Sequence, residues 1–150
     1  MILTESDTMY AVIRIRGTVN MTPRIGSALE TMNLRRVSNL SLWSETPQSF
    51  EMIKKVKDYV TYGKIDDATL KELIEKRAKP VKAGEKVDAK KVFAALKEGK
   101  YPRAAGIKNL FKMSPPKGGY ERKGIKVVFR IGGALGDRKE KINELIQRMM

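Results

Sequence analysis

A segment rich in cations, in the second half of the chain, indicates a chemical role more clearly than any other feature of the sequence. Between residues 100 and 123 only Glu121 opposes a set of seven cations, namely Lys100, Arg103, Lys108, Lys112, Lys117, Arg122 and Lys123. Tyr101, Phe111 and Tyr120 are interleaved with them. Cationic side chains bind phosphates, and exposed aromatic rings can stack on unpaired bases. Prolines and glycines favour an irregular loop here. We predict RNA binding, with a solvated loop that only aids solubility as the simpler alternative.

A second basic set lies in the first part of the chain. Arg16 ends the first predicted strand, Arg24 lies beside the start of the first predicted helix, and Arg35 and Arg36 follow its last turn. A helix N-terminus with nearby arginines suits a phosphate group, so we expect Arg16 and Arg24 to contact RNA. Arg35 and Arg36 have an equally good structural explanation, because cations at a helix C-terminus offset the helix dipole.

Two other patterns invite a nucleotide-binding or catalytic interpretation. Residues 132–136 read Gly-Gly-Ala-Leu-Gly, but the segment lacks the G-x-G-x-x-G spacing and the lysine-hydroxyl pair of phosphate-binding loops. We interpret it as a tight turn that, together with Arg138, could contact an RNA phosphate. Asp66 and Asp67 stand where a helix is expected to start, which is typical of caps rather than of a magnesium or acid–base pair.

The composition favours a polyanionic partner over catalysis. The 150 residues include 31 Lys and Arg against 17 Asp and Glu, a formal net charge of +14 that attracts nucleic acid or an anionic surface. Cysteine and histidine are both absent, which excludes disulfides and Cys-ligated zinc and removes the commonest general base. We therefore predict no enzymatic activity and no cofactor. Because no signal peptide or membrane-spanning segment is evident, we expect a cytoplasmic protein with no membrane partner.

The elements that must position these residues begin with a unit over residues 1–65. The expected strands cover residues 10–16, 37–43 and 59–62, and the last of them is closed by Gly63. Thr22-Pro23 and Thr46-Pro47 each mark the start of a helix, with threonine as cap and proline in the first turn. The pattern predicts an α+β fold with a ferredoxin-like-type β-α-β-α-β core. We expect a small antiparallel sheet with both helices on one face.

Residues 66–150 are expected to form an extension packed on this core. Two helices are predicted, one from Asp66 or Asp67 to about Arg77 and one from Asp88 to Gly99. The basic loop 100–123 follows them. In residues 125–131 an apolar side chain stands at every second position, which predicts a strand; Ile125, Val127, Phe129 and Ile131 alternate with Lys126, Val128 and Arg130. The last predicted helix covers 138–149, with an inward stripe of Ile142, Leu145, Ile146 and Met149.

These residues together resemble a universal family of large-subunit ribosomal proteins, called L-thirty in bacteria and L-seven in eukaryotes. Tyr10 to Gly17, Leu34 to Val37 and Tyr59 to Gly63 resemble the whole of the short bacterial member. The second half is similar to the archaeal and eukaryotic extension, most specifically at residues 111–119 and 132–138, continued by 142–146. The resemblance covers nearly the full chain beyond the first eight residues. Eukaryotic members carry a long basic amino-terminal arm, so the archaeal form is the better match.

The resemblance implies a structural constituent of the large ribosomal subunit. It implies contact with 23S rRNA, proximity to 5S rRNA and to neighbouring ribosomal proteins, a role in subunit assembly and translation, and no small-molecule substrate. It also places Arg35, Arg36, Lys112, Lys117 and Arg138 within family-typical segments.

Two rival functions remain open. A DNA-binding architectural protein is the main alternative, but it would concentrate its cations on a recognition helix or a β-arm. Here the cations spread over loops and helix ends, which suits an irregular RNA surface better. A small enzyme acting on nucleic acid or a phosphorylated substrate is the second rival. It would need a metal-dependent activity that is lost when Asp66 and Asp67 are changed.

Overall fold

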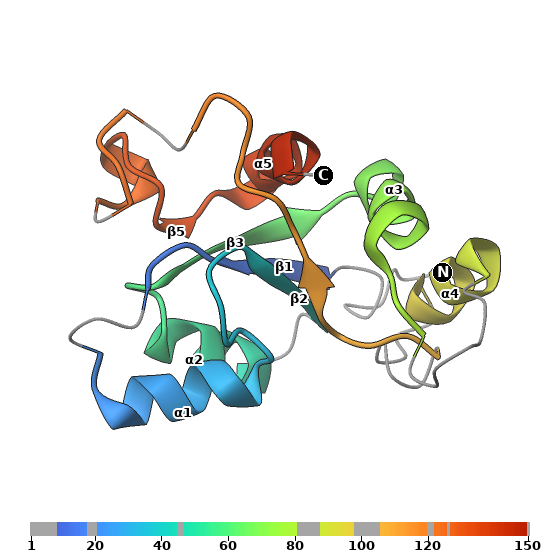
Figure 1. Cartoon of the computed structure of the whole chain (residues 1–150), viewed down its shortest axis with the longest axis horizontal. Coiled ribbons are helices and arrows are strands. Elements are labelled where there is room, and N and C mark those ends of the chain that lie inside the picture. Colours follow the sequence, from blue (N-terminus) through green and yellow to red (C-terminus); the bar gives the residue numbers. More distant parts are fainter. Residues whose placement is uncertain are drawn as a thin grey trace.

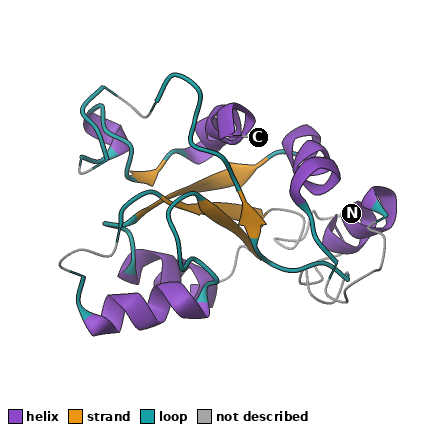
Figure 2. Cartoon of the chain, viewed as in Figure 1, coloured by secondary structure: helices purple, strands orange, loops and turns teal. Residues whose placement is uncertain are grey.

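A computed structural model describes residues 9–17, 21–44, 47–80, 88–119 without 98–105, 122–125 and 127–149. Its centre is a five-stranded sheet of order β4-β2-β1-β3-β5 (Figures 1 and 2). The strands are β1 (Met9–Arg14), β2 (Asn39–Ser44), β3 (Val60–Ile65), β4 (Phe111–Lys112) and β5 (Gly136–Asp137). β1 pairs antiparallel with β2 and with β3, β4 lies antiparallel to β2, and β5 runs parallel to β3. The predicted α+β class and antiparallel core are confirmed.

Helices cover both faces of this sheet. They are α1 (Pro23–Thr31), α2 (Pro47–Lys55), α3 (Asp67–Arg77), α4 (Ala89–Lys97) and α5 (Ile142–Met149), with short 3-10 turns η2 (Phe129–Ile131) and η3 (Lys139–Lys141). α1 and α2 lie together on one face, as predicted, and α3 and α5 lie on the other (Figure 1). None of the helices in the described part of the chain is long and apolar enough to cross a membrane.

The alternation of β1 divides the core into two layers. Val12 packs with Leu29 of α1 and Ile53 of α2, whereas Ala11 and Ile13 face the layer that the second half of the chain supplies. This second layer contains the predicted inward stripe of α5, namely Ile142, Leu145, Ile146 and Met149, all 0% exposed. Each such side chain stabilises the fold by roughly 1.5–3 kcal/mol of apolar burial. The division of the chain into a core of residues 1–65 and an extension of residues 66–150 stays a prediction.

Caps define the starts of the central helices. The Asp66 carboxylate accepts a hydrogen bond from the Thr69 amide at 2.8 Å, which confirms its predicted capping role. Asp88 does the same for α4, accepting from the amides of Lys90 and Lys91. Thr22 occupies the cap position of α1 in an extended conformation, but its side chain makes no capping hydrogen bond. Thr46 lies outside the described residues.

The strand predicted over residues 125–131 is wrong. Its described residues make one bridge, between Val128 and Leu135, and then turn into η2. Gly132 adopts a left-handed φ of 103° and turns the chain back on itself, so that the Phe129 amide donates to the Leu135 carbonyl. The alternating side chains therefore lie on a loop that contains η2 and folds back on itself, and Ile131 is 57% exposed.

Two predicted boundaries also shift. β3 does not end at Gly63 but continues through it to Ile65. The last α-helix begins at Ile142 rather than at residue 138, because Lys139 has a left-handed φ of 51°, which a right-handed helix cannot contain. η3 fills the gap between β5 and α5.

Candidate nucleic-acid interface

A buried arginine organises the basic residues at the end of β1. Arg14 is 2% exposed, and its Nη1 donates to the carbonyls of Leu34 at 2.9 Å and Arg35 at 2.6 Å. Its Nε donates to the Arg16 carbonyl at 2.9 Å. Burial lowers the pKa of the Arg14 guanidinium from its usual range, but an arginine remains cationic at neutral pH. Arg14 thus ties the end of β1 to the loop that follows α1.

Three of the predicted RNA-binding arginines lie on the backbone segments that Arg14 joins, and a fourth lies near them. Arg16 is half-buried, with its guanidinium 4.8 Å above the Tyr59 ring and bonded to the Asp58 carbonyl. Arg35 and Arg36 are exposed on the loop that Arg14 holds. Arg24 is exposed in the first turn of α1, one turn after Met21, whose sulfur lies 4.0 Å from Arg14 Nη2.

The short strand β4 brings a lysine from the second basic segment to the same place. Lys112 pairs in register with Asn39 of β2. The next amide, that of Met113, donates to the Ser38 carbonyl, and the Ser38 amide donates to the Arg14 carbonyl at 2.7 Å. Lys112 itself is exposed. We call this surface the Arg14 corner; its cations are Arg16, Arg24, Arg35, Arg36 and Lys112.

Lys117 belongs to a different basic group. Its amide donates to the carbonyl of Arg148 at 3.1 Å, and Arg148 Nη1 donates to the Gly119 carbonyl. Arg77 reaches the same segment through a 3.2 Å hydrogen bond from Nη2 to the Ser114 hydroxyl. Arg77 and Arg148 were not selected from the sequence, although each lies in the last turn of its helix, where a cation offsets the dipole.

The remaining predicted cations are spread more widely. Lys108 is exposed and follows Ile107, which makes an isolated bridge with Pro80, and the Lys108 amide donates to the Lys79 carbonyl. Arg122 and Lys123 are exposed at the base of the loop that contains η2, and the Lys123 amide donates to the Gly132 carbonyl. Lys100 and Arg103 lie outside the described residues. The structure therefore gathers five of the twelve predicted cations at the Arg14 corner.

Two side chains expected at the RNA surface are used inside the protein. Phe111 is 0% exposed, so the expectation that it could stack on bases is wrong. Arg138 is 4% exposed, donates from Nε to the Thr61 hydroxyl at 2.8 Å, and lies 4.7 Å from the Phe129 ring centre. The Gly133 amide donates to the Val128 carbonyl. These internal contacts remove Arg138 and Gly133 from the surface that we consider.

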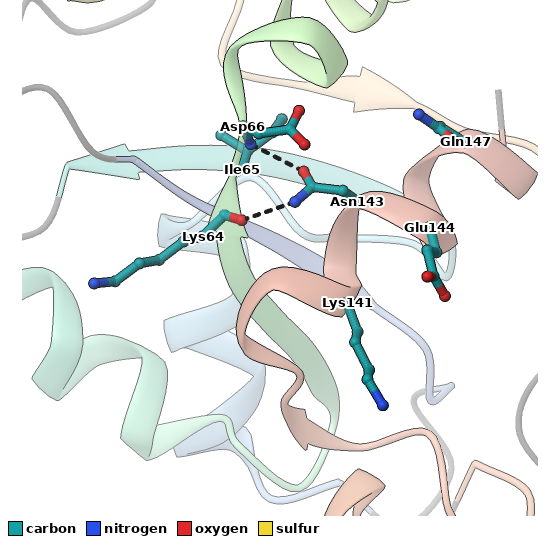
Figure 3. A pocket seen from close by; sticks show the side chains of 7 residues that line it. All are labelled: Lys64, Ile65, Asp66, Lys141, Asn143, Glu144 and Gln147. Atoms are coloured by element: carbon teal, nitrogen blue, oxygen red, sulfur yellow. Dashed lines mark hydrogen bonds between the residues drawn. The ribbon is translucent and has the colours of Figure 1, made fainter.

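A pocket of about 740 Å³ lies between the end of β3 and α5 (Figure 3). At its centre the Asn143 amide bridges the strand end, donating to the Lys64 carbonyl and accepting from the Asp66 amide at 3.0 Å. Of the residues that the structure describes, two lysines and the two carboxylates of Asp66 and Glu144 line the pocket. Their charges offset one another, so the pocket has no preference for an anion. Across the described residues, no three acidic side chains gather to hold a metal.

The hydrogen bonds from Arg14 to the backbone carbonyls lead to a prediction for the free energy of unfolding. Arg14→Met should lower the free energy of unfolding by about 3 kcal/mol, because it leaves one buried and two part-buried carbonyl oxygens without donors. Each loss costs roughly 1–3 kcal/mol, partly relieved by water. Arg24→Met, at an exposed position, is the matched control and should stay within about 0.5 kcal/mol of the parent. Urea unfolding measures both. Equal midpoints for the two variants would show that these hydrogen bonds contribute nothing.

Comparison with known proteins supports the resemblance seen in the sequence. The family model described as ribosomal protein L30p/L7e matches residues 10–60. The large ribosomal subunit protein uL30 of Methanococcus vannielii is 41% identical over 154 residues, which cover 94% of this chain and 99% of that protein.

Similar relatives occur in other organisms. The uL30 protein of Nanoarchaeum equitans is 40% identical over 152 residues, covering 93% of this chain and 97% of that protein. The uL30 protein of Aeropyrum pernix is 35% identical over 158 residues, covering 95% and 99%. The likeness thus extends over nearly the whole chain, and the protein belongs to the uL30 family of large ribosomal subunit proteins.

Proposed function

We propose that this chain is a structural constituent of the large ribosomal subunit in the cytoplasm and binds 23S rRNA through the Arg14 corner. The observation that carries the proposal is the likeness to uL30 proteins over nearly the full chain. The corner supplies the chemistry, because four arginines and one lysine of this highly cationic chain gather on a single framework. We assign the protein a scaffolding role without catalysis, cofactor or small-molecule substrate.

The physical form of the corner suits a folded RNA. Arg14 fixes the backbone that bears Arg16 and Arg35, so these side chains are presented with little loss of backbone freedom on binding. Guanidinium groups can bind phosphate oxygens with two parallel hydrogen bonds, which fixes orientation as well as charge. Lys108, Lys117, Arg122 and Lys123 extend the basic surface at other places. Proximity to 5S rRNA and to neighbouring ribosomal proteins is part of the proposal and rests on the family resemblance.

The experiment measures binding of the purified chain to large-subunit rRNA, 5S rRNA and random duplex DNA over a salt series. We expect selective rRNA binding that survives near-physiological salt. Equal binding to all three nucleic acids, lost as salt rises, would contradict the proposal and favour the DNA-binding architectural alternative.

A pair of variants tests whether the Arg14 corner is the surface used. Arg35→Gln, Arg36→Gln and Lys112→Gln together should reduce the salt slope of rRNA binding by about 2 to 3 and weaken binding at least tenfold. Lys71→Gln, Lys76→Gln and Lys90→Gln together remove the same charge from exposed positions on α3 and α4. This control should keep nearly the parental affinity. An equal loss in both triple variants would show that only net charge matters.

A further inference from the structure

A second hollow, of about 560 Å³, opens beside β1, β3 and η3. Its lining residues are Tyr10, Lys64, Asp137, Arg138, Lys139 and Lys141. It differs from the pocket between β3 and α5, whose charges offset one another, in carrying an excess of cations. Among the described residues that line it, three exposed lysines and the buried Arg138 stand against one carboxylate, and this excess of cations attracts anions. Its volume lies within the range of about 300–1,000 Å³ that small-molecule sites occupy.

Sheet register places an aromatic ring and a cation side by side at this hollow. Tyr10 pairs directly with Lys64 of β3 on one side and with Trp43 of β2 on the other. Directly paired residues point to the same face of a sheet, so the three side chains form a row across it. Figure 3 shows the Lys64 side chain leaving β3 on the side away from Asn143.

The Tyr10 ring is held in place by other rings. It meets the Tyr62 ring edge-on, with centroids 6.2 Å apart, and the Phe50 ring at 6.4 Å in a tilted arrangement. Tyr10 remains only half-buried and lines the hollow. A ring fixed in this way offers a stacking surface at little cost in side-chain entropy.

Backbone strain marks the edge of the hollow. Lys139 has a left-handed φ of 51°, a conformation that is strained for a residue other than glycine. The Asp137 carboxylate accepts a hydrogen bond from the Lys139 amide at 2.8 Å and so helps to hold this turn. Glycine or asparagine would adopt the turn at lower cost, yet this chain places there a lysine that lines the hollow.

We propose that this hollow binds one unpaired nucleotide of RNA. The base stacks on Tyr10, and Lys64, Lys139 and Lys141 bind the phosphates on either side of it. Stacking on an aromatic side chain is sequence-tolerant and is a usual way of recognising single-stranded RNA. The inference rests on the proposed function, since it supposes an RNA partner, and it adds a site separate from the Arg14 corner.

The test compares two short probes of equal charge, a cytidine pentanucleotide and its abasic analogue, with the full chain. Trp43, the single tryptophan, is paired with Tyr10 and reports binding by its fluorescence. We expect the cytidine probe to bind about tenfold more tightly than the abasic one. Tyr10→Leu should abolish this difference, and Tyr10→Phe should retain it. Lys64→Gln should weaken both probes equally, whereas Lys90→Gln, the control, should change neither.

The outcomes separate this inference from the proposed function. If the two probes bind the parent equally while rRNA binding stays selective, the nucleotide site is wrong and the ribosomal proposal stands. Loss of selective rRNA binding in the parent would instead contradict the proposed function. Tighter binding of a glutamate pentapeptide than of the cytidine probe would also overturn the site, because it would mark a surface for acidic proteins. The unfolding midpoint of each variant shows whether it is folded.

Discussion

Replacing Gly63 with alanine is expected to destabilise this protein by about 3 kcal/mol or more. Gly63 lies inside β3, where the first turn of α5 crosses the sheet. A methyl group added at Gly63 would lie 2.8 Å from Ile142 Cβ and 2.9 Å from its Cγ2, and would also meet the backbone carbonyl of Lys139. Because Ile142 is fully buried and the carbonyl is part of the chain, neither can move aside without shifting α5.

Gly26→Ala is the matched control for this substitution. Gly26 lies within α1, and the nearest atom to an added methyl group would be the Met21 sulfur at an ordinary 3.7 Å. Alanine is favoured over glycine in a helix by about 0.5–1 kcal/mol, so this variant should unfold at a higher urea concentration than the parent. The two glycine variants should therefore change the free energy of unfolding in opposite directions. A Gly63→Ala midpoint within experimental error of the parent would show that α5 does not pack this closely on β3.

The shift at Gly63 shows the limit of local patterns. In the sequence, a glycine after Tyr59 to Tyr62 is typical of a strand end, and that interpretation was wrong. The glycine is required by a segment nearly eighty positions further along the chain, which approaches β3 too closely for a side chain. No periodicity around residue 63 carries this information, because the constraint arises from packing between distant elements.

The helix that has both a cap and an apolar stripe was predicted well, since Asp66 with the buried Leu70, Leu73 and Ile74 defines α3. The apolar stripe from Ile142 predicted that α5 exists but not where it begins. The alternation over residues 125–131 misled because a strand also needs an edge to pair with. The edge of β3 is taken by β5, which pairs Gly136 with Thr61, so the alternating segment folds on itself at Gly132.

The sequence predicted which cations form the candidate interface but not how they are arranged in space. Charge and loop position selected Arg16, Arg35, Arg36 and Lys112. The placement of Lys112 beside the arginines depends on the pairing of β4 with β2 across more than seventy residues. Arg14, whose hydrogen bonds fix the backbone of Arg16 and Arg35, was not selected from the sequence. Tyr10 and Lys64 were missed as a pair because only sheet register places them opposite each other.

Substitution of Phe111 is expected to have the second large effect on stability. Its result distinguishes a residue of the hydrophobic core from a residue that contacts RNA. Phe111→Ala should lower the free energy of unfolding by about 3–5 kcal/mol, because it empties space in the core layer between the sheet and α3 to α5. Phe111→Leu, which keeps most of the apolar volume, should cost less than about 1.5 kcal/mol. Urea unfolding of both variants measures the difference, and near-equal small losses would contradict the buried position.

The leucine variant also decides what the ring does in the proposed complex with RNA. A base-stacking role would make Phe111→Leu lose roughly tenfold in rRNA affinity, since leucine offers no π surface. A core role keeps affinity within about twofold to threefold, because β4 still pairs with β2 and still presents Lys112 beside Ser38 and Asn39. We expect the second result. The aromatic residue in the most basic segment then serves RNA binding indirectly, by fixing the strand that carries the neighbouring lysine to the Arg14 corner.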